Sequence, residues 1–228
     1  MTDPDNFGLS NVFKKDFQSR VIEWAKKNLV DYPWRQKRTP YKVLISEILL
    51  TRTKADQVEP AYEKFIEEYP TVEEFSVVKA SKVKNIIKSL GLLFRVNTLN
   101  TISAQIKSNH NNSIPNDLKN LKKLKGIGDY GANAILCFGF GLRRPILDSN
   151  FIRIYERVFE IKPKTKTAKT DKYLWKFAEF LLPQEHFVQY NYGLLDIGGQ
   201  ICKPRKPNCE NCPLTSLCLY YKESRSEQ

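Results

Sequence analysis

Residues 118–139 read LKNLKKLKGIGDYGANAILCFG, and the interpretation of this stretch decides the fold. Its glycines, GIGDYG at 126–131, match the G-x-G-x-x-G pattern of a dinucleotide-binding turn, and Asp148 follows where such a fold places an acid for a ribose hydroxyl. That turn must follow a buried parallel strand rich in Val and Ile. Here several lysines alternate with leucines spaced three apart, a helical pattern that a buried strand could not accommodate. The pattern therefore disfavours a nicotinamide cofactor.

Helical periodicity extends along nearly the whole chain. Apolar side chains from Phe13 to Ala25 recur at four-residue spacing, and alternating strand patterns and Asn-Gly hairpin turns are absent. We predict an all-α protein. Its further helices are expected at 41–50, 58–66, 81–91, 93–106, 114–124, 129–138, 149–160, 171–183 and 186–198, with Gly91 as a stop signal and a basic linker at 162–170.

Charge and size limit the functional classes. The 228 residues include 37 Lys+Arg against 25 Asp+Glu, a formal net charge of +12, which favours a polyanionic partner such as nucleic acid over a merely well-solvated surface. No apolar run approaches the roughly 18 residues of a membrane span, so we expect no membrane association. The opening MTDPDNFGLS lacks the features of a signal peptide, which predicts a cytoplasmic, nucleoid-associated protein.

A helix, a tight Gly-x-Gly turn and a second helix would form a hairpin with outward-facing backbone N–H groups. Gly126 and Gly128 let another backbone approach, the following helix adds its positive N-terminus, and Lys125 adds a full charge beside them. An ordinary αα turn is the simpler reading of the glycines alone. In this basic context, duplex phosphate is the better-matched ligand.

Four of the five cysteines lie within 17 residues. Cys202, Cys209, Cys212 and Cys218 form C-x6-C-x2-C-x5-C, and in an intracellular protein such clustering indicates a metal rather than disulfides. Four thiolates suit either structural zinc or a [4Fe–4S] cluster. Lys203, Arg205 and Lys206 lie between the first two cysteines, where we expect them to lower the thiolate pKa values and to meet DNA phosphate.

These motifs together resemble the endonuclease III superfamily of helix-hairpin-helix DNA glycosylases. LKKLKGIGDYGANAIL resembles the hairpin, PILDSNFIRI resembles the loop carrying the catalytic aspartate, and the cysteine spacing resembles the iron–sulfur loop. The resemblance runs from YPWR at 32–35 to Cys218 and favours a [4Fe–4S] cluster over zinc. It implies a helical barrel domain of six helices at 31–141, a cluster domain of 1–30 plus 142–228, and an active site between them.

The resemblance also assigns catalytic groups. Asp148, which by itself suggests a helix N-cap, would stabilise an oxocarbenium-like sugar or deprotonate water, and cap hydrogen bonds would keep it ionised. Asn150 would position the water or the sugar. Glu47, in an apolar helix, is either half of a structural ion pair or a general acid with a raised pKa.

Tyr130 stands where bifunctional members carry an attacking lysine. A phenol cannot form a Schiff base, so we expect a monofunctional glycosylase without strong AP lyase activity. Leu92 resembles the intercalating wedge, with core packing as the alternative. Thr51, Arg52 and Thr53 form the matching loop, and Arg52 has the hydrogen-bonding geometry to read an orphaned guanine.

Two branches of the superfamily lack the lysine, and three features favour the thymine/uracil branch over the adenine branch. The loop LLTRT lacks glutamines, Tyr192 replaces a base-reading Gln or Glu, and ten residues follow Cys218. We therefore predict a monomeric enzyme that flips thymine or uracil out of G·T and G·U mispairs in double-stranded DNA. An adenine glycosylase, a non-catalytic iron–sulfur DNA-binding module and a zinc-stapled helical protein remain alternatives.

Overall fold

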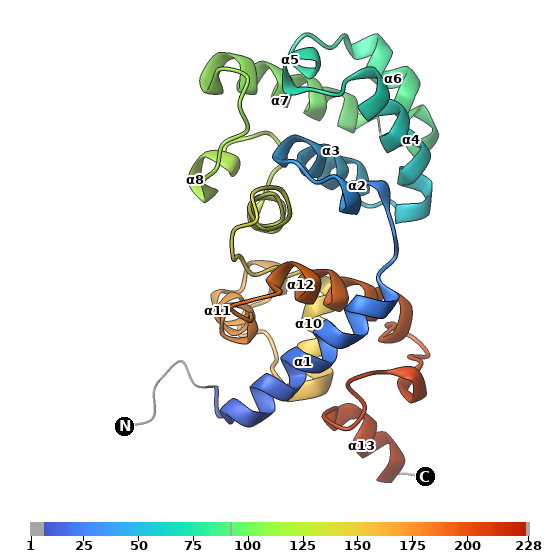
Figure 1. The fold of residues 1–228 in the computed structure, drawn as a ribbon, viewed down its shortest axis with the longest axis vertical. Coiled ribbons are helices and arrows are strands. Elements are labelled where there is room, and N and C mark those ends of the chain that lie inside the picture. Colours follow the sequence, from blue (N-terminus) through green and yellow to red (C-terminus); the bar gives the residue numbers. More distant parts are fainter. Residues whose placement is uncertain (1–6, 92, 227–228) are drawn as a thin grey trace. The chain divides into compact units, whose positions relative to one another are not determined.

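The computed structural model describes residues 7–91 and 93–226, with no side chain described at Ser226. Throughout these residues the regular structure is helical and no strand is formed, which confirms the predicted all-α class (Figure 1). No helix among them is both long and apolar enough to cross a bilayer.

The chain forms two compact units, Met1–Val30 with Arg143–Gln228, and Asp31–Leu142. The first unit contains α1 (Asn11–Asn28), α10 (Ser149–Phe159), η3 (Ala168–Thr170), α11 (Lys172–Leu181), α12 (Phe187–Asp196), η4 (Ile197–Ile201), η5 (Cys209–Asn211) and α13 (Leu219–Ser226). The second contains α2 (Pro33–Gln36), α3 (Pro40–Leu50), α4 (Ala55–Glu68), α5 (Val72–Phe75), α6 (Ala80–Ile87), η1 (Lys88–Leu90), α7 (Phe94–His110), α8 (Leu118–Leu121), α9 (Asp129–Ala134) and η2 (Ile135–Gly139).

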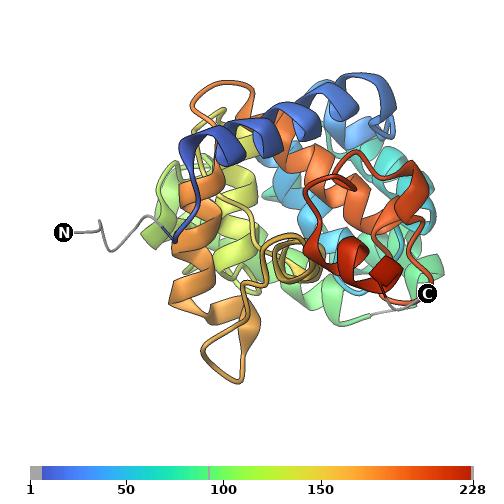
Figure 2. The same cartoon turned by 90° about the horizontal axis from the view of Figure 1, so that it is seen from below.

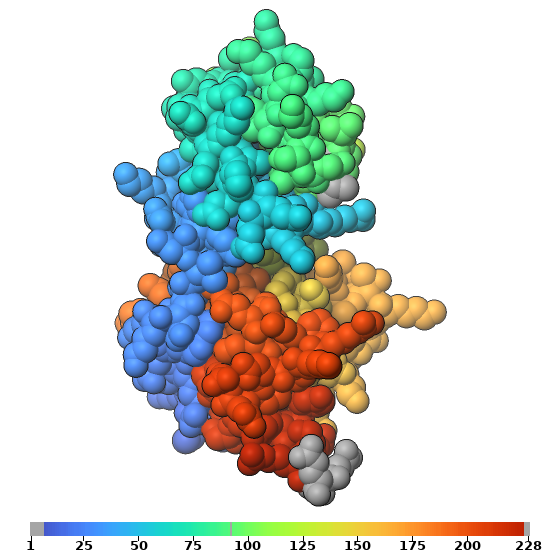
Figure 3. All heavy atoms as spheres, turned by 90° about the vertical axis from the view of Figure 1, so that its right-hand side faces the viewer, coloured from blue at the N-terminus to red at the C-terminus, as the bar shows by residue number. Residues whose placement is uncertain are grey.

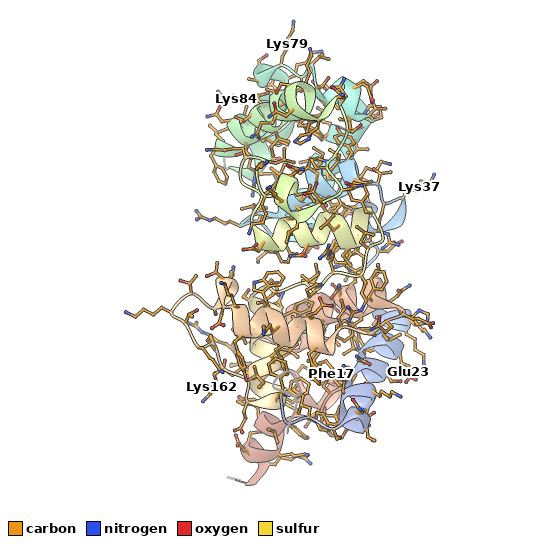
Figure 4. The ribbon with its side chains drawn as sticks, turned by 90° about the vertical axis from the view of Figure 1, so that its left-hand side faces the viewer. Phe17, Glu23, Lys37, Lys79, Lys84 and Lys162 are labelled. Atoms are coloured by element: carbon orange, nitrogen blue, oxygen red, sulfur yellow. The ribbon has the colours of Figure 1, made fainter. Side chains whose placement is uncertain are left out.

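The core of the first unit is aromatic. Helix α1 packs along α12, and the Phe17 ring lies 4.8 Å from Phe159 and 6.2 Å from Tyr190, centroid to centroid (Figure 2). Figure 4 shows Phe17 turned into the unit, while Glu23 on the same helix lies at the surface. Such edge-to-face contacts add about 0.5–1.5 kcal/mol per pair beyond the burial of apolar area. They fix α10, which carries the Asp148 cap.

The second unit packs α3 against α4, α7 and the α9–η2 segment. Seven of the eleven residues of α3 are buried, as the apolar run at 41–50 predicts. The lysines of this unit remain outside: Lys37, Lys79 and Lys84 project from the ribbon in Figure 4. The surface of this unit is therefore basic while its interior is apolar.

The two helices predicted on either side of the glycine turn differ from the expected form. The helix predicted at 114–124 is reduced to the four residues of α8, because Asp117 caps it and tight i→i+3 bonds follow, such as Leu124 N–H to the Leu121 carbonyl at 3.1 Å. The helix predicted at 129–138 changes from α9 to the π-helical η2. Gly91 ends its helix as predicted, with φ at +73°.

Candidate functional site

The two glycines of the turn between α8 and α9 differ: the backbone conformation requires glycine at 126, whereas position 128 has open space around it. Gly126 has φ of +77°, which L side chains rarely adopt, and a Cβ there would lie 3.3 Å from Thr98 Cγ2. Gly128 is the N-cap of α9, and a Cβ added there would have no neighbour within 4 Å. The backbone at Gly128 is therefore accessible to a ligand, and no side chain caps the helix that follows.

Helix α7 supports the hairpin from behind. The Gln105 side chain donates to the Lys123 carbonyl at 3.0 Å and accepts from the Lys125 N–H at 2.9 Å. These two bonds hold the chain on both sides of Leu124, directly before the glycine turn. The sequence reading did not identify Gln105, because its partners lie 18 and 20 residues away.

The charge at the hairpin is smaller than the lysine count suggests. Lys122 forms an ion pair with Asp129, in the first turn of α9, and Lys123 Nζ donates to Asn120 Oδ1 at 3.1 Å. Lys125 is exposed beside Gly126, as the sequence predicts. Of the hairpin lysines, Lys125 is therefore the one best placed to meet an external anion.

Asp148 is the N-cap of α10, where the sequence places it. Its Oδ1 accepts from the Asn150 N–H at 2.8 Å and the Phe151 N–H at 3.0 Å, and its Oδ2 accepts from Asn150 Nδ2 at 3.0 Å. Three hydrogen bonds therefore fix the carboxylate in one orientation. A fixed carboxylate can stabilise a developing positive charge or take a proton from water.

Burial and the cap hydrogen bonds act in opposite directions on the pKa of Asp148. Burial raises the pKa of Asp148 above its usual value, and this effect exceeds the opposing hydrogen bonds from Phe151 and Asn150 and the charges of Lys169 and Arg153. A raised pKa increases the proton affinity of the carboxylate. This change suits a group that has to accept a proton from water.

A chain of hydrogen bonds links Asp148 to the first cysteine of the metal loop. Asn150 Oδ1 accepts from Arg153 Nη2 at 2.7 Å, and Arg153 Nε donates to the Cys202 carbonyl at 2.6 Å. Arg153 Nη2 also donates to the Gly198 carbonyl at 2.7 Å. A Cβ on Gly198 would lie 2.4 Å from Asn150 Cβ, so only glycine lets η4 approach this closely. The sequence reading missed Arg153, although its position three residues after Asn150 places both on one helix face.

The four predicted metal ligands surround one cavity. Cys202, Cys209, Cys212 and Cys218 line it together with apolar side chains such as Ile154 and Leu214. Among the described residues, no three His, Cys, Asp or Glu side chains are grouped so as to hold a single metal ion. Four thiols that line one cavity fit a shared metal group.

Burial acts on the thiols of the metal loop. It raises the pKa of the Cys209 and Cys218 thiols and raises that of Cys212 to about 11. Arg157, which the sequence reading missed, lowers the pKa of Cys209 and donates to Cys202 Sγ at 3.3 Å. Lys203, Arg205 and Lys206 of the same loop are exposed.

The loop at Thr51, Arg52 and Thr53 is a strained turn held by a buried arginine. Arg52 is exposed and has φ of +59°, an uncommon value for a residue with a side chain. Arg95, with 0% of its surface exposed, donates from Nη2 to the Thr51 carbonyl and to Thr53 Oγ1, the latter at 2.6 Å. Nothing in the local pattern distinguishes Arg95, since its partners lie over 40 residues away.

The remaining predicted residues occupy the following positions. Glu47 is half-buried in α3 and Tyr130 half-buried in α9. Tyr192 lies in α12 with 6% of its surface exposed, so its ring presents little area for stacking on a base. Leu92, the predicted wedge, lies outside the described residues; its neighbours Leu93 and Phe94 are 51% and 47% exposed.

The fixed aspartate at a helix N-terminus, the glycine hairpin and the four-cysteine cavity together define the class of helix-hairpin-helix DNA glycosylases with an iron–sulfur loop. Two family models agree: residues 45–180 match the HhH-GPD superfamily of base excision DNA repair proteins, and residues 202–218 match the iron-sulfur binding domain of endonuclease III. The chain belongs to the HhH-GPD superfamily, and its cofactor is a [4Fe–4S] cluster; the matched residues 202–218 include the four cysteines.

The alignments with individual relatives cover almost the full chain. The chain is 35% identical to the thymine/uracil-DNA glycosylase of Pyrobaculum aerophilum, covering 91% of this chain and 92% of the relative. It is also 35% identical to the adenine DNA glycosylase of Buchnera aphidicola, covering 92% of this chain but 59% of that relative. The structure of a thermostable thymine-DNA glycosylase superposes with a TM-score of 0.86 at 34% identity, over 93% of this chain and 98% of the other.

Proposed function

We propose that this protein is a monofunctional DNA glycosylase that removes thymine or uracil mispaired with guanine. The Asp148 carboxylate, fixed by three hydrogen bonds at the N-terminus of α10, supports a hydrolytic role. The substrate assignment is supported by similarity to thymine/uracil-DNA glycosylases over about nine tenths of both chains.

In the proposed reaction the enzyme first extrudes the mispaired nucleotide, which costs a few kcal/mol and costs least at a mispair. Leu92 is the proposed wedge that fills the gap, and Arg52 the proposed reader of the orphaned guanine. The exposure of Arg52, on a turn that Arg95 holds rigid, supports this role. Affinity comes from duplex phosphate at Lys125, Gly126 and Gly128 and from the metal-loop residues Lys203, Arg205 and Lys206.

Bond cleavage is assigned to Asp148, which stabilises the oxocarbenium-like sugar or deprotonates the attacking water while Asn150 orients it. Glu47 would protonate the departing base, a step that thymine or uracil leaving as an anion needs less. Tyr130 has no amine to form an imine with the sugar, so strand cleavage is not expected at a significant rate. Tyr192 is the proposed contact to the extruded base, and it would have to become more accessible than its 6% exposure.

The cluster has a structural role in this proposal. Cys202, Cys209, Cys212 and Cys218 would hold the cluster, which would crosslink the loop 202–218; the carbonyl of Cys202 accepts a hydrogen bond from Arg153. Arg153 in turn orients Asn150 and through it Asp148.

The proposal is tested by single-turnover base release from labelled duplexes carrying G·T, G·U, A·G, or A opposite 8-oxoguanine, read with and without alkali. Strand breaks at G·T and G·U that appear only after alkali are expected. Breaks without alkali would contradict the monofunctional assignment. Release of adenine would leave the proposed role of Asp148 intact but show that the substrate is adenine. An adenine glycosylase is the second candidate function, because the chain is 35% identical to an adenine DNA glycosylase.

A further inference from the structure

The linker between α10 and α11 carries a dense positive charge. Lys162, Lys164, Lys166 and Lys169 are all exposed, and residues 161–170 contain no Asp or Glu. The ion pairs found among the described residues do not involve these four lysines. We name residues 162–170 the basic loop; Lys162 is labelled in Figure 4.

The basic loop is structurally fixed, although its composition suggests a flexible linker. Asp171, buried at the N-cap of α11, accepts from the Lys164 N–H at 2.5 Å and the Thr165 N–H at 2.8 Å. Trp175 Nε1 donates to the Lys169 carbonyl at 2.9 Å. These hydrogen bonds reduce the ordering cost that a flexible loop would incur on binding a ligand.

The fixed loop lies beside the helix that carries Asp148. Its η3 segment packs against both α10 and α11, and Lys169 is close enough for its charge to act on the Asp148 carboxyl. In Figures 2 and 3 the segment joining α10 and α11, coloured gold to orange, projects outward from its unit. The loop therefore presents several lysines to solvent on the side of its unit that carries the catalytic aspartate.

We propose that the basic loop is a phosphate-binding element, distinct from the hairpin, that binds the backbone of duplex DNA next to the excised nucleotide. The proposal rests on the proposed function and adds a partner for residues to which that function assigns no role. Four lysines on an anchored loop match a run of phosphates, and a protein that neutralises phosphates releases condensed counterions. The contribution should therefore be independent of DNA sequence and sensitive to salt.

The test compares two triple variants that remove the same charge from the same unit. K162Q/K164Q/K166Q alters the basic loop, and K15Q/K26Q/K27Q alters exposed lysines of α1. Affinity for a fully paired fluorescent duplex is measured by anisotropy from low to moderate salt. Each lost phosphate contact should reduce the slope of log K against log salt by about 0.9, so the loop variant should lose a slope of about 1–3 and the α1 variant almost none. Equal changes in the two variants would overturn the proposal.

A second variant tests the anchoring of the loop while leaving its lysines in place. D171S keeps a hydroxyl that can cap α11 but cannot accept from both Lys164 and Thr165, and it leaves every lysine in place. It should weaken duplex binding severalfold with an unchanged salt slope, although loss of a carboxylate beside the lysines would by itself strengthen binding; thermal unfolding checks that the variant is folded. Binding equal to that of the unaltered protein would show that anchoring of the loop is irrelevant.

The two proposals can fail separately. Duplex affinity is measured on DNA without a mispair, so it does not depend on base release. If the protein releases neither thymine nor uracil but shows the loop-specific loss of salt slope, the proposed function is refuted and the DNA-binding role of the basic loop stands. If base release is normal and no loop-specific loss is seen, the proposed function stands and the role of the basic loop is refuted.

Discussion

The N-termini of α9 and α10 differ in how their free backbone N–H groups are used. At α10 the Asp148 side chain accepts from the Asn150 and Phe151 N–H groups, so the helix end is satisfied internally. At α9 the N-cap is Gly128, which has no side chain, and no side-chain cap is formed. One helix end thus holds its own anion in a fixed position, and the other has no side-chain cap at its first turn.

In the proposed mechanism the same local chemistry, a helix N-terminus, serves catalysis at α10 and DNA binding at α9. At α10 the helix fixes a carboxylate whose pKa burial raises. At α9 the glycine turn brings the backbone to the surface, with Lys125 beside it. Changes at α10 should therefore affect the rate of bond cleavage, and changes at the hairpin should affect DNA affinity.

The largest effect is expected for D148N. Asparagine is also a favoured N-cap, so the fold should be retained while the base function is lost. Excision measured under single turnover should fall by about 10²–10⁴-fold, with DNA affinity unchanged. Thermal unfolding checks the fold and anisotropy checks binding. Excision at the original rate would remove Asp148 from the mechanism and with it the catalytic half of the comparison.

A smaller effect, on DNA affinity and not on the excision rate, is expected for G126A. Alanine at φ of +77° costs about 1–2 kcal/mol, and relief of this strain would distort the hairpin. Duplex affinity should fall roughly tenfold, as 1.4 kcal/mol corresponds to a factor of ten, while excision at saturating DNA stays constant. The matched control is G141A, because Gly141 has φ of +68° outside the hairpin. If both variants lose the same affinity, general strain and not the hairpin is responsible.

The smallest effect concerns pH. The pKa of Asp148 is raised in the folded protein, so the single-turnover rate should fall with decreasing pH at a midpoint above the ordinary aspartate value near 3.9. For stability the sign is opposite: a carboxyl with a raised folded pKa favours the folded state at low pH, and this contribution is lost as pH rises through that pKa. D148N should abolish this pH dependence of unfolding. A midpoint at or below the ordinary value would show that the hydrogen bonds, and not burial, dominate.

Local sequence predicts some of these features well and others poorly. The all-helical class, the αL stop at Gly91 and the cap at Asp148 follow from periodicity and from residue preferences that act within a few positions. The direction of the Asp148 pKa does not, because burial depends on α10 packing with η4, α12 and α13. The sequence also did not predict that the Lys122–Asp129 ion pair partly neutralises the hairpin, because the turn has to bring these two side chains together.

By itself the sequence determined the helical class, the glycine hairpin, the capping aspartate and the four cysteines, because each depends on chemistry within a short stretch of chain. The tertiary structure alone decided which side chains hold these parts in place: Gln105 behind the hairpin, Arg95 beneath the 51–53 turn and Arg153 between Asn150 and Cys202. Each of these side chains forms a hydrogen bond with a group that lies about 20 to 50 residues away in the sequence. Hydrogen bonds at this separation have no periodicity, so only the folded chain reveals them.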